Sequence, residues 1–125
     1  MLLLWIALGG AAGTVLRYLV GGPITALVDG QFPLGTLVIN VAGGFVIGVL
    51  SRVFLNVQAS PELHAALTVG LCGGFTTFST FSLETVGLIE GGMYARAALY
   101  VVLSVTLSIL GAAAGIGATK LLTHS

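Results

Sequence analysis

The stretch Gly73-Gly74-Phe75-Thr76-Thr77-Phe78-Ser79-Thr80-Phe81-Ser82 lies inside a long apolar segment. It is poor helix material, because glycine is too flexible and the side chains of Ser and Thr compete for backbone hydrogen bonds. Apolar sequence nevertheless continues on both sides. In a lipid bilayer, an interrupted backbone is tolerated only where protein or a water-filled cavity satisfies the exposed groups. The stretch therefore predicts a membrane-spanning helix that is broken, with a functional site at the break.

The overall composition indicates a membrane protein. Of the 125 residues, 57% are hydrophobic and 6% are charged, and the mean hydropathy is +1.13. Soluble domains have about a quarter of their residues charged. We expect residues 1–125 to form one transmembrane domain without a cleaved signal peptide. The net charge of zero argues against a nucleic-acid partner, and the single cysteine, Cys72, excludes an intramolecular disulfide.

Four segments reach the length of about 20 residues that a membrane-spanning helix needs. They cover about residues 2–27, 34–55, 62–90 and 93–122. The first is expected to loosen at Gly21-Gly22-Pro23, and the third to begin at Ser60-Pro61-Glu62 with a capping serine. The 19 glycines predict helices that approach one another closely. The predicted fold is an all-α membrane protein with four transmembrane helices, the third of them broken, and with both termini on one side.

The basic residues give no clear orientation. Arg52 and Lys120 lie on the side of the termini, whereas Arg96 lies on the other side and Arg17 leans toward it. Insertion in both directions, followed by antiparallel pairing, explains this balance; so does the scarcity of charges in a short chain. A bundle of four helices has little interior for a pathway, so we expect a homo-oligomer.

Three polar residues inside the predicted spans are candidates for function. A charge at the bilayer centre costs at least about 2.5–3.5 kcal/mol and usually faces protein or water. Arg17 can snorkel to the interface, anchor the helix or attract an anion. Glu84 can be a proton carrier, a structural acceptor or a residue at a pathway mouth. Asn40 offers two uncharged donors, or makes an ordinary hydrogen bond between helices.

Hydroxyl and aromatic side chains form a second group of candidates. Tyr100, Ser104 and Ser108 follow one another at four-residue spacing, which makes a stripe roughly 12 Å long on one helix face. Phe78 and Phe81 are about one turn apart, and the edges of their rings are electropositive. Such neutral donors suit a small, hard anion that must lose water and still leave.

The break itself offers backbone groups of both signs. The start of the second half-helix presents N–H groups, and the end of the first half presents carbonyl groups that can hold a small cation. Roughly two such carbonyls come from one chain, so a two-fold pair would provide enough ligands for an ion like sodium. In the simplest interpretation, Thr76 and Thr77 only cap the second half-helix.

Several of these residues together resemble the sequence signature of a known family. The stretch Gly73–Ser82 with Glu84 after it resembles the signature of the Fluc/CrcB fluoride channels, as do Arg17-Tyr18 and Asn40-Val41-Ala42-Gly43. The resemblance covers the whole chain. It implies an antiparallel, dual-topology homodimer in the inner (plasma) membrane, with two pores through which cytoplasmic fluoride leaves passively.

The resemblance also implies roles for individual residues. Phe78 and Phe81 would contact fluoride through their ring edges, and Asn40 would be the pore asparagine. The carbonyl groups of Gly73 and Thr76 would hold a structural sodium ion on the two-fold axis. The remaining positions match the polar track of the family (Ser79, Thr80, Tyr100, Ser104 and Ser108) and its vestibules (Arg17 and Glu84).

Two other classes remain as alternatives. A small four-span, proton-coupled exporter relies on a carboxylate in its first span, where this chain has only Arg17. A structural membrane subunit without transport activity explains the glycines, but not the hydroxyl stripe or the phenylalanine pair. We do not expect an enzyme, because the sequence has no visible pairing of a nucleophile with a base.

Overall fold

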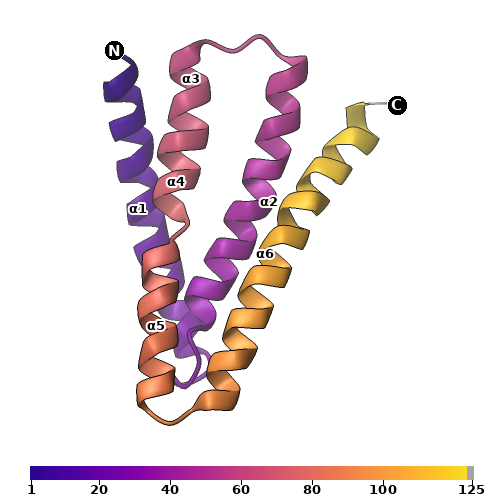
Figure 1. Ribbon diagram of the computed structural model, residues 1–125. Coiled ribbons are helices and arrows are strands. Elements are labelled where there is room, and N and C mark those ends of the chain that lie inside the picture. The colour runs from indigo at the N-terminus through magenta and orange to yellow at the C-terminus, as the bar shows by residue number, and fades with distance from the viewer. Residues whose placement is uncertain (124–125) are drawn as a thin grey trace.

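The computed structural model describes residues 1–123, and this part of the chain contains helices but no strand. Its elements in chain order (Figure 1) are α1 (Leu2–Ala26), α2 (Leu34–Asn56), α3 (Pro61–Ala65), the π-helix η1 (Ala66–Cys72), α4 (Gly73–Phe75), α5 (Phe78–Glu90) and α6 (Tyr94–Thr123). Four stretches are long and apolar enough to cross a membrane: Leu2–Ala26, Leu34–Asn56, Pro61–Glu90 and Tyr94–Leu122. The predicted all-helical fold with four spans is confirmed.

The four spans pack as two pairs. α1 makes its largest contact with η1 and α4, and α2 makes its largest contact with α6. Figure 1 shows that α1 begins and α6 ends at the same end of the bundle, as an even number of spans predicts. The third span, which is paired with α1, also contacts α2, so the stretch Gly73–Ser82 lies next to both α1 and α2.

Glycines bring the paired helices into direct backbone contact. A methyl group added at Gly9 of α1 would overlap the carbonyl oxygen of Ala66 in η1. A Cβ atom at Gly44 of α2 would lie 2.8 Å from the carbonyl oxygen of Ser108 in α6. Small residues at such positions allow close approach in lipid, where the hydrophobic effect does not drive helices together.

The backbone of the third span changes its geometry twice. It is π-helical in η1, and helical structure ends after Phe75. Thr76 (φ −85°, ψ 159°) and Thr77 (φ −152°, ψ 121°) are extended, and helical structure resumes with Phe78 in α5. The two threonines therefore form an extended link between two helical halves, near the middle of the span (Figure 1).

Side-chain hydrogen bonds fix the ends of several helices. Ser60 Oγ accepts the backbone N–H of Leu63 at 3.1 Å, which confirms the predicted start of the third span. α1 runs through Pro23 to Ala26 without interruption, so the loosening expected there does not end the helix. Thr25 Oγ1 accepts the N–H of Gly35 at 2.8 Å and ties the end of α1 to the start of α2.

Large apolar side chains mostly face outward from the single chain, as expected for a surface that meets lipid or another protein. The buried residues form one small cluster where α2, α5 and α6 meet: Leu37, Phe81, Leu88, Ala97 and Tyr100. Tyr100 is completely buried in it. This cluster joins the two ends of α5, through Phe81 and Leu88, to the first turns of α6.

Candidate functional site

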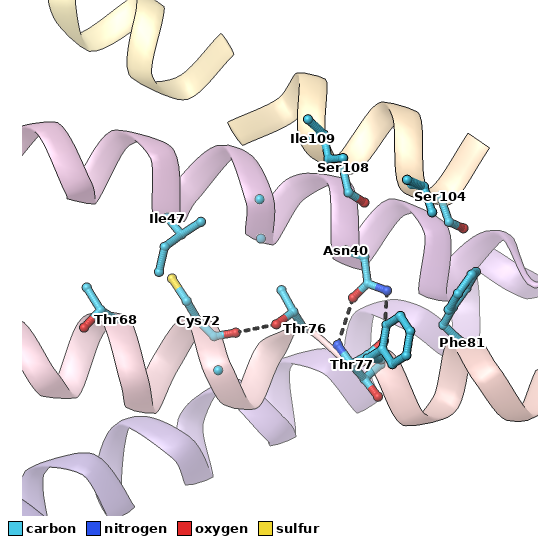
Figure 2. Close-up of a pocket in the computed structure, with 15 residues that line it drawn as sticks. Asn40, Ile47, Thr68, Cys72, Thr76, Thr77, Phe81, Ser104, Ser108 and Ile109 are labelled. Atoms are coloured by element: carbon cyan, nitrogen blue, oxygen red, sulfur yellow. Dashed lines mark hydrogen bonds between the residues drawn. The ribbon is translucent and has the colours of Figure 1, made fainter. Parts of the chain in front are cut away.

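A cavity of about 440 Å³ lies between α2, the interrupted third span and α6 (Figure 2). We call it the central cavity. None of the described residues that line it is charged. Its walls are made by Asn40, Gly43, Gly44, Ile47, Thr68, Cys72, Gly73, Thr76, Thr77, Phe78, Phe81, Ser104, Val105, Ser108 and Ile109. The structure thus brings seven of the predicted site residues to one place: Asn40, Gly73, Thr76, Phe78, Phe81, Ser104 and Ser108.

The carboxamide of Asn40 is bound to the backbone of the extended link. Its Nδ2 donates to the carbonyl oxygen of Thr77 at 2.9 Å, and its Oδ1 accepts the N–H of Thr77 at 2.8 Å. Figure 2 shows both bonds between α2 and the third span. Of the alternatives for Asn40, the hydrogen bond between helices is therefore present, and it is made to the backbone at the break.

Phe78 and Phe81 lie together at the start of α5, as their spacing predicts. Their ring centroids are 5.5 Å apart, with 48° between the ring planes. Phe81 is 8% exposed and packs against Tyr100, with ring centroids 5.1 Å apart. Phe78 is 77% exposed in the single chain. The ring of Phe81 is thus held inside the bundle, whereas the ring of Phe78 lies on the outer surface of the single chain.

The predicted hydroxyl stripe of α6 divides into two parts. Ser104 and Ser108 line the central cavity, and Ser104 Oγ is buried without a hydrogen-bond partner among the described residues. A buried hydroxyl in a membrane helix usually bonds to its own helix backbone. Tyr100 lies beyond this cavity, where its hydroxyl donates to Glu84 Oε1 at 2.9 Å. Glu84 is therefore an acceptor for a buried tyrosine, one of the three roles considered for it.

A second cavity, of about 760 Å³, lies between α1, α2 and α5, and we call it the lateral cavity. Arg17 and Glu84 both line it, together with Thr80 and three other threonines of α1 and α2. Among the described residues, Thr77 alone belongs to the walls of both cavities. Ser79 lines neither of them, and its hydroxyl lies 3.4 Å from Thr77 Oγ1.

The two halves of the broken span end in different ways. Cys72 O accepts both the N–H and the hydroxyl of Thr76, each at 3.0 Å. Thr77 Oγ1 accepts the N–H of Thr80 at 3.1 Å and so caps α5. The predicted capping role is thus correct for Thr77, whereas the hydroxyl of Thr76 points back into the first half.

The residues proposed to hold a cation offer backbone oxygens only. A helix leaves its last carbonyl groups without intrahelical partners, and Gly73 and Thr76 belong to that last turn. Gly73 is exposed in the single chain and Thr76 is half-buried. Within residues 1–123, no cluster of three or more His, Cys, Asp or Glu side chains could hold a metal ion. Carbonyl oxygens fit a hard monovalent cation, but one chain supplies too few of them.

Sequence reasoning missed several lining residues. Cys72 and the pair Gly43 and Gly44 line the central cavity because small side chains leave room there. Thr77 was considered only as a cap, although its backbone is the partner of Asn40. A signal existed for Thr77, because an extended residue in a membrane must find partners for its N–H and C=O groups.

Comparison with known proteins identifies the family. The model of the CrcB-like protein family, Camphor Resistance (CrcB), matches residues 4–116. The Fluoride-specific ion channel FluC of Geobacter sulfurreducens is 48% identical over 119 residues, which cover 94% of this chain and 96% of that protein. FluC of Nitrobacter winogradskyi is 48% identical over 115 residues, covering 91% of each chain. FluC of Rhizobium meliloti is 44% identical over 115 residues, covering 91% of this chain and 92% of the relative. The chain therefore belongs to the CrcB-like protein family.

Proposed function

We propose that this protein is a passive, fluoride-selective ion channel that exports cytoplasmic fluoride across the inner (plasma) membrane. Its similar relatives are named fluoride-specific ion channels, which are transport proteins and not enzymes. Its four apolar spans are long enough to cross a bilayer. The observation that carries the proposal is the central cavity, whose uncharged walls contain both an unpaired serine hydroxyl and a pair of phenylalanine rings.

The walls of this cavity suit an anion that binds weakly enough to leave. Ser104 has a buried hydroxyl free to donate, and Asn40 and Ser108 lie on the same cavity. Ring edges of Phe78 and Phe81 add a weak positive potential. A lysine or arginine here would hold a hard anion too tightly for rapid passage, whereas a carboxylate would repel it. We assign the fluoride pathway to these five residues.

The other predicted track residues lie around the lateral cavity. Thr80 lines it, and Tyr100 is joined to it through Glu84. Arg17 supplies the positive charge on its wall, which raises the local concentration of anions. We propose that this cavity is the vestibule of the pathway. Ser79, at the outer surface of α5, would join the track only where a second copy covers it.

We propose that the working unit is an antiparallel, dual-topology homodimer with two pores. Phe78 is 77% exposed and the central cavity is incompletely enclosed by one chain, so a partner is needed to exclude lipid. The balance of basic residues at the two ends of the bundle permits insertion in both directions. An isologous contact across the broken span would bring two copies of Gly73 and Thr76 together on a two-fold axis.

A sodium ion on that axis is the third part of the proposal. The carbonyl groups of Gly73 and Thr76, doubled by the axis, would supply its ligands. When bound, the ion would offset the negative ends of two half-helices that face each other. The residues of this chain act by fixing the carbonyl directions, since Cys72 O holds Thr76 from one side and Asn40 holds Thr77 from the other.

The function is tested by fluoride release from proteoliposomes, followed with a fluoride electrode. We expect release without an imposed proton gradient, and much slower release of chloride than of fluoride. Ser104→Ala should slow fluoride release, because it removes the unpaired donor while leaving the packing of α6 intact. Equal release of both halides, or no release of fluoride, would reject the channel. Release only with a proton gradient would favour the four-span exporter.

A further inference from the structure

Both polar atoms of the Asn40 side chain are engaged by a single residue. Nδ2 donates to the carbonyl of Thr77 and Oδ1 accepts its N–H. In an extended residue such as Thr77, the N–H and C=O groups point to the same side of the backbone. Neighbouring strands use this property when two residues exchange a pair of hydrogen bonds. Here a side-chain amide takes the place of the second strand, and we call the pair of bonds the Asn40–Thr77 clamp.

The clamp gives both backbone groups of Thr77 a partner from another helix. Thr77 is extended and is the N-cap of α5, so its N–H has no place in the ladder of α5, whereas its C=O stands at the start of that ladder and can accept a bond from Asn40 as well. An unsatisfied buried polar group costs about 1–3 kcal/mol, and more in hydrocarbon than near water. Asn40 is 37 residues away in sequence, so only the packing of α2 against the third span brings it there. A single amide thus makes the break tolerable in the membrane.

One donor of Asn40 remains after the clamp is made. A carboxamide has two N–H groups, and within residues 1–123 Nδ2 donates only to Thr77. The amide proton on the same side as Oδ1 is the one that can reach Thr77 together with Oδ1. The other proton, on the side of the Cβ atom, is left over. Asn40 is half-buried and lines the central cavity, where that second proton has no protein acceptor.

The clamp also lies at the boundary between the two cavities. Thr77 is the residue that their walls share in the described part of the chain, and Asn40 reaches it from the central side. Movement of the Thr77 peptide would alter both cavities at once. Phe78 follows directly after the clamp, and Thr76 precedes it. The direction of the Phe78 ring and that of the Thr76 carbonyl therefore both depend on the same two hydrogen bonds.

We infer that Asn40 is a positioning residue whose first task is to hold the Thr77 backbone, and that only its second amide proton serves the anion. The first half of this statement stands on the geometry alone, whereas the second rests on the proposed function. An asparagine is the suitable residue, since it supplies one acceptor and two donors without charge. An aspartate would keep the acceptor but would place a carboxylate oxygen against the carbonyl of Thr77.

Isotope labelling of asparagine side chains tests both halves in the intact protein. The chain has two asparagines, Asn40 and Asn56, so labelling Asn with ¹⁵N gives two pairs of amide proton signals by NMR. Asn56 donates to Arg52 O at the surface and serves as the internal control. We expect one Asn40 proton to exchange with deuterium at least about tenfold more slowly than the other. Fluoride, but not chloride, should shift the signal of the faster-exchanging proton more than that of the slower one.

The outcomes separate the two halves of the inference. Equal exchange of both Asn40 protons, or a larger fluoride shift on the slowly exchanging proton, would overturn the clamp. A slow proton together with no response to fluoride would leave the clamp standing and would reject the anion contact. That result would count against the role of Asn40 in the pathway, without deciding whether the protein conducts fluoride.

A pair of variants provides the second measurement. In Asn40→Leu, the backbone amide of Thr77 should exchange at least about tenfold faster than in the parent protein, and fluoride release should fall. In Ser108→Ala, which changes another polar side chain of the same cavity, exchange at Thr77 should be unchanged. Unchanged exchange at Thr77 in Asn40→Leu would overturn the inference. If that variant does not fold, the exchange rates of the parent protein decide the matter alone.

Discussion

Thr76 and Thr77 are adjacent, chemically identical and extended, yet their hydroxyls have different functions. The hydroxyl of Thr76 donates to Cys72 O, which also accepts the N–H of Thr76. The hydroxyl of Thr77 accepts the N–H of Thr80, which has no partner inside α5. The loss of the first bond leaves no backbone group unsatisfied, whereas the loss of the second does.

Valine substitutions at these two positions should therefore differ. Thr77→Val keeps the shape of the side chain but removes the cap, so we expect a loss of about 1 kcal/mol in the free energy of unfolding. Thr76→Val should change it by less than about 0.5 kcal/mol. Reversible unfolding in mixed micelles measures both. An equal loss in the two variants would show that the cap at Thr77 does not stabilise α5.

Local features of the break were predictable from sequence, but its tertiary partners were not. Ser60 and Thr77 cap helices through residues three positions away, and such contacts leave a signature in the sequence. Asn40 meets Thr77 across 37 positions, and nothing in the local sequence specifies that pairing. The four-residue spacing from Tyr100 to Ser108 correctly predicted one helix face. It could not predict that the hydroxyl of Tyr100 donates to Glu84 and lies outside the central cavity.

At the scale of single elements, the π-helix η1 is the feature that sequence reasoning did not anticipate. A π-helical segment inserts one extra residue into a helix and often occurs next to functional sites. η1 ends at Cys72, just before the turn whose carbonyls face the break. Gly70, within η1, lies against the backbone of α1 at Ile6 and Gly9. The π-helical segment thus coincides with a close tertiary contact, which the composition of Ala66–Cys72 does not reveal.

The contact between α1 and the third span should be sensitive to one added methyl group. A Cβ atom at Gly13 would overlap Leu71 O and lie 2.8 Å from Phe75 N. Backbone atoms cannot rotate away, so Gly13→Ala should lower the free energy of unfolding by about 1–3 kcal/mol.

Gly22→Ala on the same helix is the matched control, because a Cβ atom there meets nothing within 4 Å. Removal of a glycine from a helix interior should make that variant neutral, or more stable by up to about 1 kcal/mol. Thermal unfolding in one detergent compares the two variants. Similar melting temperatures would contradict the close contact at Gly13.

At the scale of the whole molecule, Gly73 separates contacts within the chain from contacts with a second copy. A Cβ atom at Gly73 would meet only Thr68 O, at 3.9 Å, so one chain alone tolerates alanine there. If two copies meet at this point around sodium, the added methyl group has to enter the interface. Gly73→Ala should then shift the protein toward monomer. The affinity of the dimer for sodium should fall at least about tenfold.

Gly87→Ala is the control for this substitution, since a Cβ atom at Gly87 also finds open space. Mass photometry or light scattering, with sodium or with a large organic cation, gives the fraction of dimer. A Gly73→Ala protein that dimerises as well as the parent, in either salt, would argue against a shared cation at this position.

Dual topology can be tested through charges at the two ends of the bundle. Asn56→Arg with Gln58→Arg should fix one orientation, and Glu90→Lys with Tyr94→Lys should fix the other, because basic loops stay in the cytoplasm. Either biased chain alone should confer little fluoride resistance on a sensitive bacterium. Co-expression of the two should restore resistance. Full resistance with one biased chain would contradict antiparallel pairing.

The glycine contacts between α1 and the third span have a further consequence, which concerns the conformational entropy of side chains. Gly9 and Gly13 meet the carbonyl groups of η1 without an intervening side chain. Burial of a long side chain costs up to about 2 kcal/mol in lost rotamer entropy, whereas burial of glycine costs none. At Gly9 and Gly13 the contact between α1 and η1 therefore contains no side chain that could change its rotamer. The backbone contact behind the broken span therefore lacks the motion that side-chain rotation gives to other helix contacts.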